Sequence, residues 1–200
     1  MGREPFRDRT DAGTCLARKL GDLRPCNPLV AAIPRGGVPV GRVIADALGA
    51  ELDVVLTAAS LFPDVDQSGA LGRGFAEKLR RRRILYTGQE EAVEAANRTV
   101  IVVDDGMATV PTLLAAIRAI RARRPRRLVV ATPIASPSAL DLLSGEADEI
   151  RVLAAPPAFE SIRQFYRYYP SVSDLEVTSA FENGRVVRPA AALLVGPGAL

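Results

Sequence analysis

Two adjacent carboxylates, Asp104 and Asp105, come directly after five β-branched residues at positions 99–103. Such a run is typical of a strand that is buried on both faces, so we expect the acids at the carboxyl end of this strand. Carboxylates accept hydrogen bonds from hydroxyl groups, and a pair of them suits the hydroxyls of a ribose. The alternative is a plain strand-ending turn, because Asp and Gly are common turn residues.

A short turn and a helix are expected next, since an apolar stripe at helical spacing covers residues 113–120. Gly106 permits a tight bend, and Thr109 and Thr112 fall near the start of the helix. Free N–H groups and the dipole at a helix N-terminus favour an anion. The acids and this turn together predict a site for a sugar phosphate.

A second turn that suits an anion follows the first apolar run of the chain. Apolar runs and turn residues predict a strand, a helix and another strand in succession, at residues 29–33, 40–48 and 52–56. This βαβ unit calls for neighbouring parallel strands. Its first turn contains Arg35, Gly36 and Gly37, where glycine lets the backbone approach a ligand and arginine can bind phosphate. An ordinary strand-to-helix turn is the alternative.

Strands and helices continue to alternate along the rest of the chain. The other expected elements are helices at 15–20, 71–79 and 89–97, strands at 84–86, 128–133 and 150–154, and a helix capped by Ser136. The pattern predicts an α/β fold, a doubly wound and mostly parallel sheet with helices on both faces and ligands at the carboxyl ends of the strands. We expect a hairpin turn at Asn183 and a frayed tail after Pro189.

Five of the ten aromatic residues lie between positions 159 and 169. This cluster follows the last expected strand, and its members Phe159, Phe165 and Tyr166 could stack against a flat acceptor ring. A satellite hydrophobic core is the alternative.

Composition excludes several classes of function. The 200 residues are 48% hydrophobic and 24% charged, as expected for one soluble domain. The sequence has no histidine, which excludes Ser-His-Asp, Cys-His and histidine-based zinc chemistry. Cys15 and Cys26 lack metal-ligand spacing and are expected to be free and buried. A charged N-terminus and the lack of a long apolar run predict a cytoplasmic protein without a membrane span.

The net charge of +3 is compatible with either a nucleic acid or a small anionic substrate. Arginines cluster at 80–83 and 118–127, the second time around the end of an expected helix. Arginine there complements the helix dipole, and no aromatic residues interleave with the cluster as a platform for single strands would require. We therefore favour a small anion and expect no nucleic-acid partner.

The run from Val100 to Thr112 resembles the phosphoribosyl-pyrophosphate (PRPP) signature of type I phosphoribosyltransferases. That signature has apolar residues, two acids, Gly or Ser, two small or apolar residues, Thr-Gly, any residue and Thr. The chain departs from it at Val110, where the family has Gly. We expect Pro111 to push Val110 toward extended geometry, to start the helix itself, and to reshape the phosphate turn.

Other segments extend the resemblance over residues 6–57 and 99–178. Pro34-Arg-Gly-Gly resembles the pyrophosphate loop of the family, and Phe6-Arg-Asp-Arg-x-x-Ala-Gly resembles a branch of small bacterial phosphoribosyltransferase-like proteins. Residues 58–98 diverge: the Arg-Lys pair that usually follows the second strand is absent, and either a lid or insert or an ordinary surface loop is expected at 62–74. We assign a domain to 1–178 and a tail to 179–200.

The resemblance implies displacement of pyrophosphate from PRPP by an acceptor that the sequence does not specify. Asp104 and Asp105 would be the catalytic residues. The implied PRPP-binding residues are Arg35, Gly36, Gly37, Gly106, Met107, Ala108, Thr109 and Thr112. Mg²⁺ would arrive with the substrate rather than in a protein cage, and a second copy of the chain would form a homodimer. The alternative is a degenerate relative that senses a nucleotide or sugar phosphate.

Overall fold

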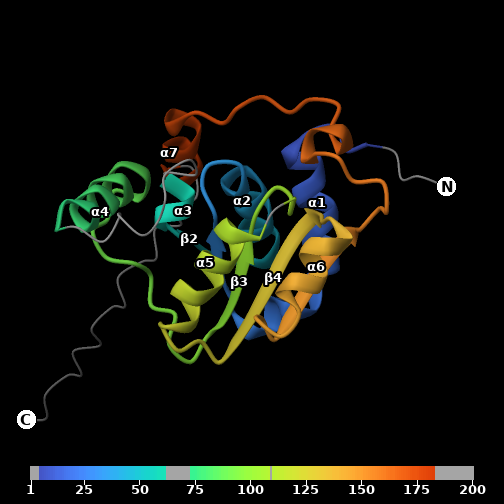
Figure 1. The fold of residues 1–200 in the computed structure, drawn as a ribbon. Coiled ribbons are helices and arrows are strands. Elements are labelled where there is room, and N and C mark those ends of the chain that lie inside the picture. Colours follow the sequence, from blue (N-terminus) through green and yellow to red (C-terminus); the bar gives the residue numbers. More distant parts are fainter. Residues whose placement is uncertain (1–4, 62–72, 109, 183–200) are drawn as a thin grey trace, which may run out of the picture.

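The computed structural model of the chain describes residues 5–61, 73–108 and 110–182. Its centre is a five-stranded parallel sheet (Figure 1). The strands are β1 (Leu29–Ala32), β2 (Glu51–Val54), β3 (Thr99–Val103), β4 (Arg127–Ile134) and β5 (Glu149–Ala154). The order β2-β1-β3-β4-β5 is that of a doubly wound sheet, so the expected fold class is confirmed.

Helices cover both faces of the sheet. They are α1 (Arg9–Lys19), α2 (Gly37–Leu48), α3 (Ala58–Leu61), α4 (Arg73–Thr87), α5 (Pro111–Arg121), α6 (Pro137–Leu143) and α7 (Asp174–Glu182), with 3-10 turns η1 (Gly21–Cys26) and η3 (Ile162–Phe165). One core cluster joins α1 and α2 to the sheet, and another joins α5 and α6 to its opposite face. Figure 1 shows α5 and α6 in front of β3 and β4, with α1 and α2 behind.

Strand β3 is the central element that the sequence predicts. Its side chains alternate between the faces, Val100 and Val102 packing toward α5 and Ile101 and Val103 toward α1 and α2. Both sets are buried because helices cover both faces, which explains the unbroken β-branched run. Ala32 of β1 pairs with Val103 of β3, so the two strands end side by side. The chain order reverses between them, which is where doubly wound sheets bind ligands.

The region between β2 and β3 differs from the sequence prediction. Residues 84–86, predicted as a strand, belong to α4, where Tyr86 is buried in a core cluster with Val54 and Val177 and its hydroxyl donates to Asp174 at 2.7 Å. Residues 89–97, predicted as a helix, form no helix. Gly88 ends α4 with a φ of +67°, and the Val93 N–H instead donates to the Asp53 carboxylate at 3.0 Å. Tertiary hydrogen bonding here overrides helix propensity.

The two ends of the domain also contain more helix than expected. Helix α1 begins at Arg9, since Asp8 caps it by accepting from the Asp11 N–H at 2.8 Å, whereas the sequence predicts a start at Cys15. Helix α7 was not predicted, and the assigned boundary at 178 falls inside it. Residues 62–72 of the expected lid and the expected turn and tail from 183 onward lie outside the described residues. Across the described ranges, no helix combines the length and apolarity of a membrane span.

Candidate functional site

Two turns meet where β1 and β3 end, and we call this place the acid-pair site: Asp104 and Asp105 with residues 34–37, 106–108 and 110–112. A Cβ on Gly36 would lie 2.2 Å from Oδ2 of Asp105, and one on Gly37 would lie 2.6 Å from the carbonyl oxygen of Val103. Any side chain at these two positions would therefore collide with the acid-bearing strand end. The glycines let the two predicted turns pack directly against each other.

Arg35 provides a cation beside the acid pair. Its side chain is exposed, and within residues 5–61, 73–108 and 110–182 it has no hydrogen bond or ion pair. The next residues start α2, whose first two amides already have backbone partners: the Gly37 N–H donates to the Ile33 carbonyl at 3.0 Å and the Val38 N–H to the Arg35 carbonyl at 3.2 Å. An exposed guanidinium at the positive end of a helix dipole suits an anion such as a pyrophosphate.

The carboxylate of Asp105 is committed to a buried network. Its Oδ2 accepts from Nε of Arg9 at 2.7 Å and from the Tyr169 hydroxyl at 2.8 Å, while its carbonyl accepts from the Tyr166 hydroxyl at 2.6 Å. The side chains of Arg9 and Asp105 are only 10% and 8% exposed. Burial, and then the charge of Asp105, raises the pKa of Tyr169, so its hydroxyl remains a donor. Asp105 thus holds the site together and has little surface left for a ligand.

Arg9 is the residue of this network that sequence reasoning missed. Its Nη1 donates to the Pro170 carbonyl at 2.7 Å, and its guanidinium carbon lies 3.9 Å from the Tyr169 ring centre. One side chain therefore ties the first turn of α1 to the acid pair and to the segment after β5. The sequence signal for Arg9 was its position in the Phe6-Arg-Asp-Arg run. That run resembles a branch of the family, but the resemblance assigned no role to Arg9.

Asp104 is the less buried acid of the pair. Its side chain is half-buried, and its Oδ1 accepts from the Asp105 N–H at 2.9 Å. Among the described residues, Oδ2 has no hydrogen-bond donor. Burial of the carboxyl, together with the negative charge of Asp105, raises the pKa of Asp104 well above its usual range. Asp104 is therefore the carboxylate that could accept hydrogen bonds from a ribose.

The turn before α5, which the sequence predicts to bind phosphate, leads into a helix at the predicted residue, but its backbone does not have the predicted extended conformation. Pro111 is the first residue of α5, as predicted, but Val110 has φ −88° and ψ −31° and is not extended. Packing of Val110 against the core overrides the bias that the following proline imposes. No side chain caps α5, and the half-buried Thr112 hydroxyl has no partner in the described part of the chain. Thr109 lies outside the described residues.

Three other residues of the turn serve its packing. Met107 is buried and its N–H donates to the Ile134 carbonyl at 2.8 Å, so it has no free group to offer a phosphate. A Cβ on Gly106 would lie 2.7 Å from the Ile162 side chain. Ala108 is half-buried, and its carbonyl accepts from the Ser136 hydroxyl at 3.4 Å.

The aromatic residues between positions 159 and 169 form a satellite hydrophobic core, one of the two alternatives that the sequence leaves open. Tyr166 is buried against Phe6 and Tyr169, with ring centres 5.5 and 4.9 Å apart. The half-buried Phe165 packs against this cluster, and Phe159 stacks on Phe165 at 5.2 Å. Backbone hydrogen bonds between Phe6 and residues 165 and 167 hold the segment beside the N-terminus. An acceptor pocket on these three predicted residues stays untested.

The arginine clusters lie close to acidic side chains. Arg121 binds Asp148 through two hydrogen bonds of 2.7 and 3.0 Å, and Arg127 donates to Glu149 at 2.5 Å. In the first cluster, Arg80 and Arg81 both donate to Glu77. Local pairing of this kind is typical of a solvated surface rather than of a nucleic-acid patch.

A protein cage for a metal ion is not found where the structure describes the chain. There, no three His, Cys, Asp or Glu side chains gather closely enough to hold an ion. Cys15 and Cys26 are both free and half-buried rather than fully buried. The carboxylate that remains open to an oxygen-seeking cation at the acid-pair site is Asp104.

Comparison with known proteins points to one family. A family model described as "Phosphoribosyl transferase domain" matches residues 11–169. The protein named "Putative phosphoribosyl transferase Rv0571c" of Mycobacterium tuberculosis is 31% identical over 202 residues, which cover 87% of this chain and 46% of that protein. The chain thus spans about half the length of this relative.

Solved structures agree on the fold. The crystal structure of the protein TT1426 from Thermus thermophilus has a TM-score of 0.75 at 33% identity, covering 90% of this chain and 98% of that one. A phosphoribosylpyrophosphate synthetase from Mycobacterium smegmatis has a TM-score of 0.50 at 18% identity, over 86% of this chain and 51% of its own, a likeness of fold alone.

Proposed function

The chain belongs to the phosphoribosyl transferase domain family, and on this premise we propose that it transfers the phosphoribosyl group of PRPP to an acceptor, releasing pyrophosphate. One observation carries the proposal. Among the described residues, a carboxylate oxygen without a donor, an arginine side chain without a partner and the N-terminus of α5, which no side chain caps, converge where β1 and β3 end. PRPP has hydroxyl groups, a 5-phosphate and a pyrophosphate that match these three kinds of group.

Each group would have its own part in the reaction. Asp104 would accept hydrogen bonds from the ribose hydroxyls and lie near the positive charge that develops on the ribose as pyrophosphate leaves. Thr112 and the amides at the start of α5 would hold the 5-phosphate, and Arg35 at the positive end of the α2 dipole would hold the pyrophosphate. Asp105 would act indirectly, by holding Arg9 and the two turns in their positions.

Magnesium fits this arrangement as a companion of the substrate. It prefers oxygen ligands and keeps several waters, and the site offers the Asp104 carboxylate rather than a set of three acids in the described chain. When bound, Mg²⁺ would neutralise charge on the pyrophosphate. Cytoplasmic location is part of the same proposal, and two unpaired cysteines support a reducing compartment.

A second function is favoured by the state of Asp105. Because this acid is bound to Arg9 and Tyr169, one carboxylate of the pair is left to face a ligand. The Arg-Lys pair expected after β2 is also absent, since the sequence there reads Thr57-Ala58-Ala59. A protein of this kind could bind a nucleotide or sugar phosphate without turning it over.

Release of pyrophosphate distinguishes the two functions. The chain is incubated with PRPP, MgCl₂ and a panel of purines, pyrimidines and small amines, and pyrophosphate is measured with a coupled assay. A transferase releases pyrophosphate with one acceptor class in amounts far above the acceptor-free blank, and Asp104→Asn abolishes the excess. Binding of PRPP without such release for any acceptor would support the sensor and overturn the transferase.

A further inference from the structure

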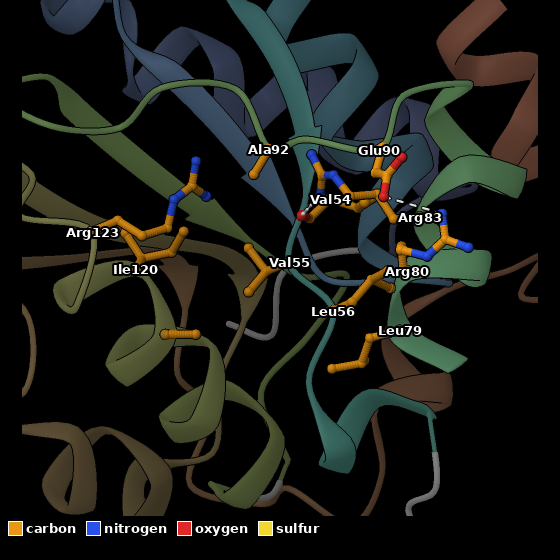
Figure 2. A pocket seen from close by; sticks show the side chains of 11 residues that line it. Val54, Val55, Leu56, Leu79, Arg80, Arg83, Glu90, Ala92, Ile120 and Arg123 are labelled. Carbon is orange, nitrogen blue, oxygen red and sulfur yellow. Dashed lines mark hydrogen bonds and ion pairs between the residues drawn. The ribbon is translucent and has the colours of Figure 1, made fainter. Parts of the chain in front are cut away.

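A cavity, which we call the arginine cavity, lies between the end of β2, α4 and the last turns of α5. Its volume is about 250 Å³. It is lined by Val54, Val55, Leu56, Leu79, Arg80, Arg83, Glu90, Ala92, Ala119, Ile120 and Arg123. Figure 2 shows Val55 between Arg123 on one side and Arg80 and Arg83 on the other. No residue of the acid-pair site is among them, so this cavity is a separate place.

The walls of the cavity combine apolar and cationic groups. Seven lining residues are aliphatic, whereas three are arginines and one is an acid. Glu90 is bound to Arg80 at 3.1 Å, which leaves the other two guanidiniums facing no acid of the lining. Ligand pockets are mostly apolar with a few placed polar groups, and this lining has that character.

Arg123 has the most capacity to bind a ligand. Within the part of the chain that the structure describes, its single hydrogen bond runs from Nη2 to the Val93 carbonyl. Its Nη1 lies 3.9 Å from Oδ2 of Asp53, which is beyond hydrogen-bonding distance. A guanidinium has five N–H donors, so most donors of Arg123 are available.

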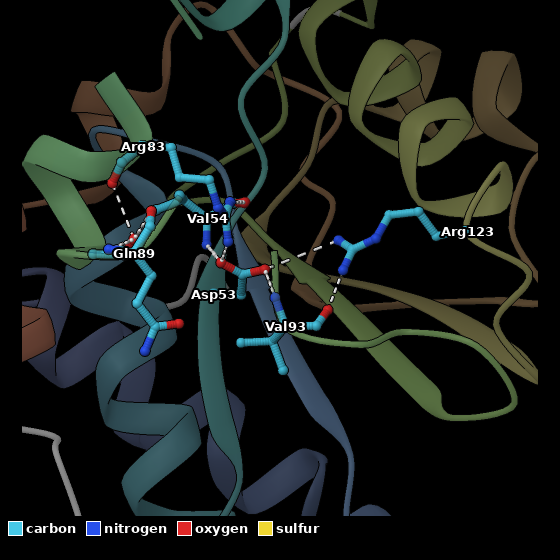
Figure 3. Close-up of polar contacts among 7 residues, drawn as sticks. Asp53, Val54, Arg83, Gln89, Val93 and Arg123 are labelled. Carbon is cyan, nitrogen blue, oxygen red and sulfur yellow. Dashed lines mark hydrogen bonds and ion pairs between the residues drawn. The ribbon is translucent and has the colours of Figure 1, made fainter. Parts of the chain in front are cut away.

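Arg83 is held in place by the buried Asp53. Its Nη2 donates to Oδ1 of Asp53, and its Nη1 donates to the Val54 carbonyl at 3.2 Å. Its Nε is buried and has no hydrogen-bond partner among the described residues. Figure 3 shows Asp53 between Arg83 and Arg123, so one carboxylate at 1% exposure orders both guanidiniums. Ordering the arginines in advance lowers the entropic cost of binding an anion.

We propose that the arginine cavity binds a small organic anion, an apolar ring that bears one phosphate or carboxylate. The aliphatic residues would contact the ring, and Arg123 with Arg83 would bind the anionic group. The cavity volume suits one ring rather than a whole nucleotide, since pockets for drug-sized ligands have volumes of about 300 Å³ or more. The proposal does not depend on the transferase reaction.

The cavity is also distant from the phosphate turn. Ile120 lies eight residues after Thr112 on α5, which places it about 12 Å along the helix axis. A ligand in the cavity therefore leaves the start of α5 free. Helix α5 contributes to both places.

Phenyl phosphate is the probe, and methyl NMR of the full chain reports where it binds. We expect shifts at Val55 and Ile120 with phenyl phosphate, and much smaller ones with phenol or inorganic phosphate alone, because ring and anion are both needed. Benzoate in a parallel titration distinguishes a carboxylate from a phosphate as the preferred group.

Variants test the residues. Arg123→Gln should weaken phenyl phosphate binding roughly tenfold, the scale for a hydrogen bond to a charged group. Ala119→Met fills the cavity without removing charge and should abolish the shifts. Arg118→Gln is the matched control, since Arg118 lies in the last turn of α5, five residues before Arg123, is 68% exposed and does not line the cavity. Shifts confined to the Thr112 region, equal shifts with phenol, or unchanged affinity in both folded cavity variants would overturn the proposal.

Discussion

Replacing Arg9 by Ala should destabilise the protein more than removal of any surface arginine. The change leaves Asp105 buried at 8% exposure without its cation, and it also removes the hydrogen bond to the Pro170 carbonyl. Breaking one side of a buried ion pair costs about 3–5 kcal/mol. The Tyr169 hydroxyl still donates to Asp105 after the change, so we expect the lower part of that range, about 3 kcal/mol.

Urea denaturation followed by circular dichroism measures this loss in the free energy of unfolding. The control is Arg7→Ala, two residues away, whose side chain is 74% exposed and bonds Asp8 at 3.2 Å. An exposed pair of this kind contributes about 0–1 kcal/mol. Arg9→Lys keeps the charge without the planar fork and should fall between the two. If Arg9→Ala costs no more than Arg7→Ala, the buried network does not hold the acid pair in place.

Three further predictions concern the acid-pair site. Asp104→Asn should raise the melting temperature at pH 7, because the raised pKa of Asp104 means that its ionised form opposes folding. The stability of the parent should therefore fall as the pH rises from the ordinary carboxyl pKa through the raised pKa of Asp104, and the difference between the two proteins should vanish below about pH 4, where the carboxyl is protonated in both the folded and the unfolded state. Gly36→Ala should cost about 1–3 kcal/mol in urea denaturation, because its Cβ would lie 2.2 Å from Asp105, whereas Gly21→Ala, with nothing within 4 Å, should cost nothing. Arg35→Ala should weaken pyrophosphate binding in calorimetry roughly tenfold and leave ribose 5-phosphate binding nearly unchanged, and equal losses would place Arg35 elsewhere.

The sequence predicted the parts of the fold whose local and tertiary preferences agree. Strand β3 and the turns after β1 and β3 were recognisable because buried parallel strands have unbroken apolar runs and the turns need glycine. The helix predicted at 89–97 failed because a distant carboxylate, Asp53, binds the Val93 N–H, and this contact has no local signal. Helix α7 was missed for a similar reason, since its core residue Val177 packs against Tyr86 of α4.

The candidate site shows the same division. The positions of Asp104, Arg35 and the two glycines follow from motif and strand order. The unequal state of the two acids does not, because it depends on Arg9, which lies 96 residues away from Asp105 in the chain. Both acids are aspartates, so residue type cannot distinguish them, and only the packing of α1 against the strand end does.

Calorimetric titration of PRPP with MgCl₂ into the parent chain and into Asp104→Asn tests the central claim most directly. We predict that the parent binds PRPP and that Asp104→Asn, folded and at least as stable, binds it roughly tenfold or more weakly, the scale for losing hydrogen bonds to a charged group. No heat of binding in the parent, or the same affinity in both proteins, would contradict the assignment of the acid-pair site to a phosphoribosyl substrate.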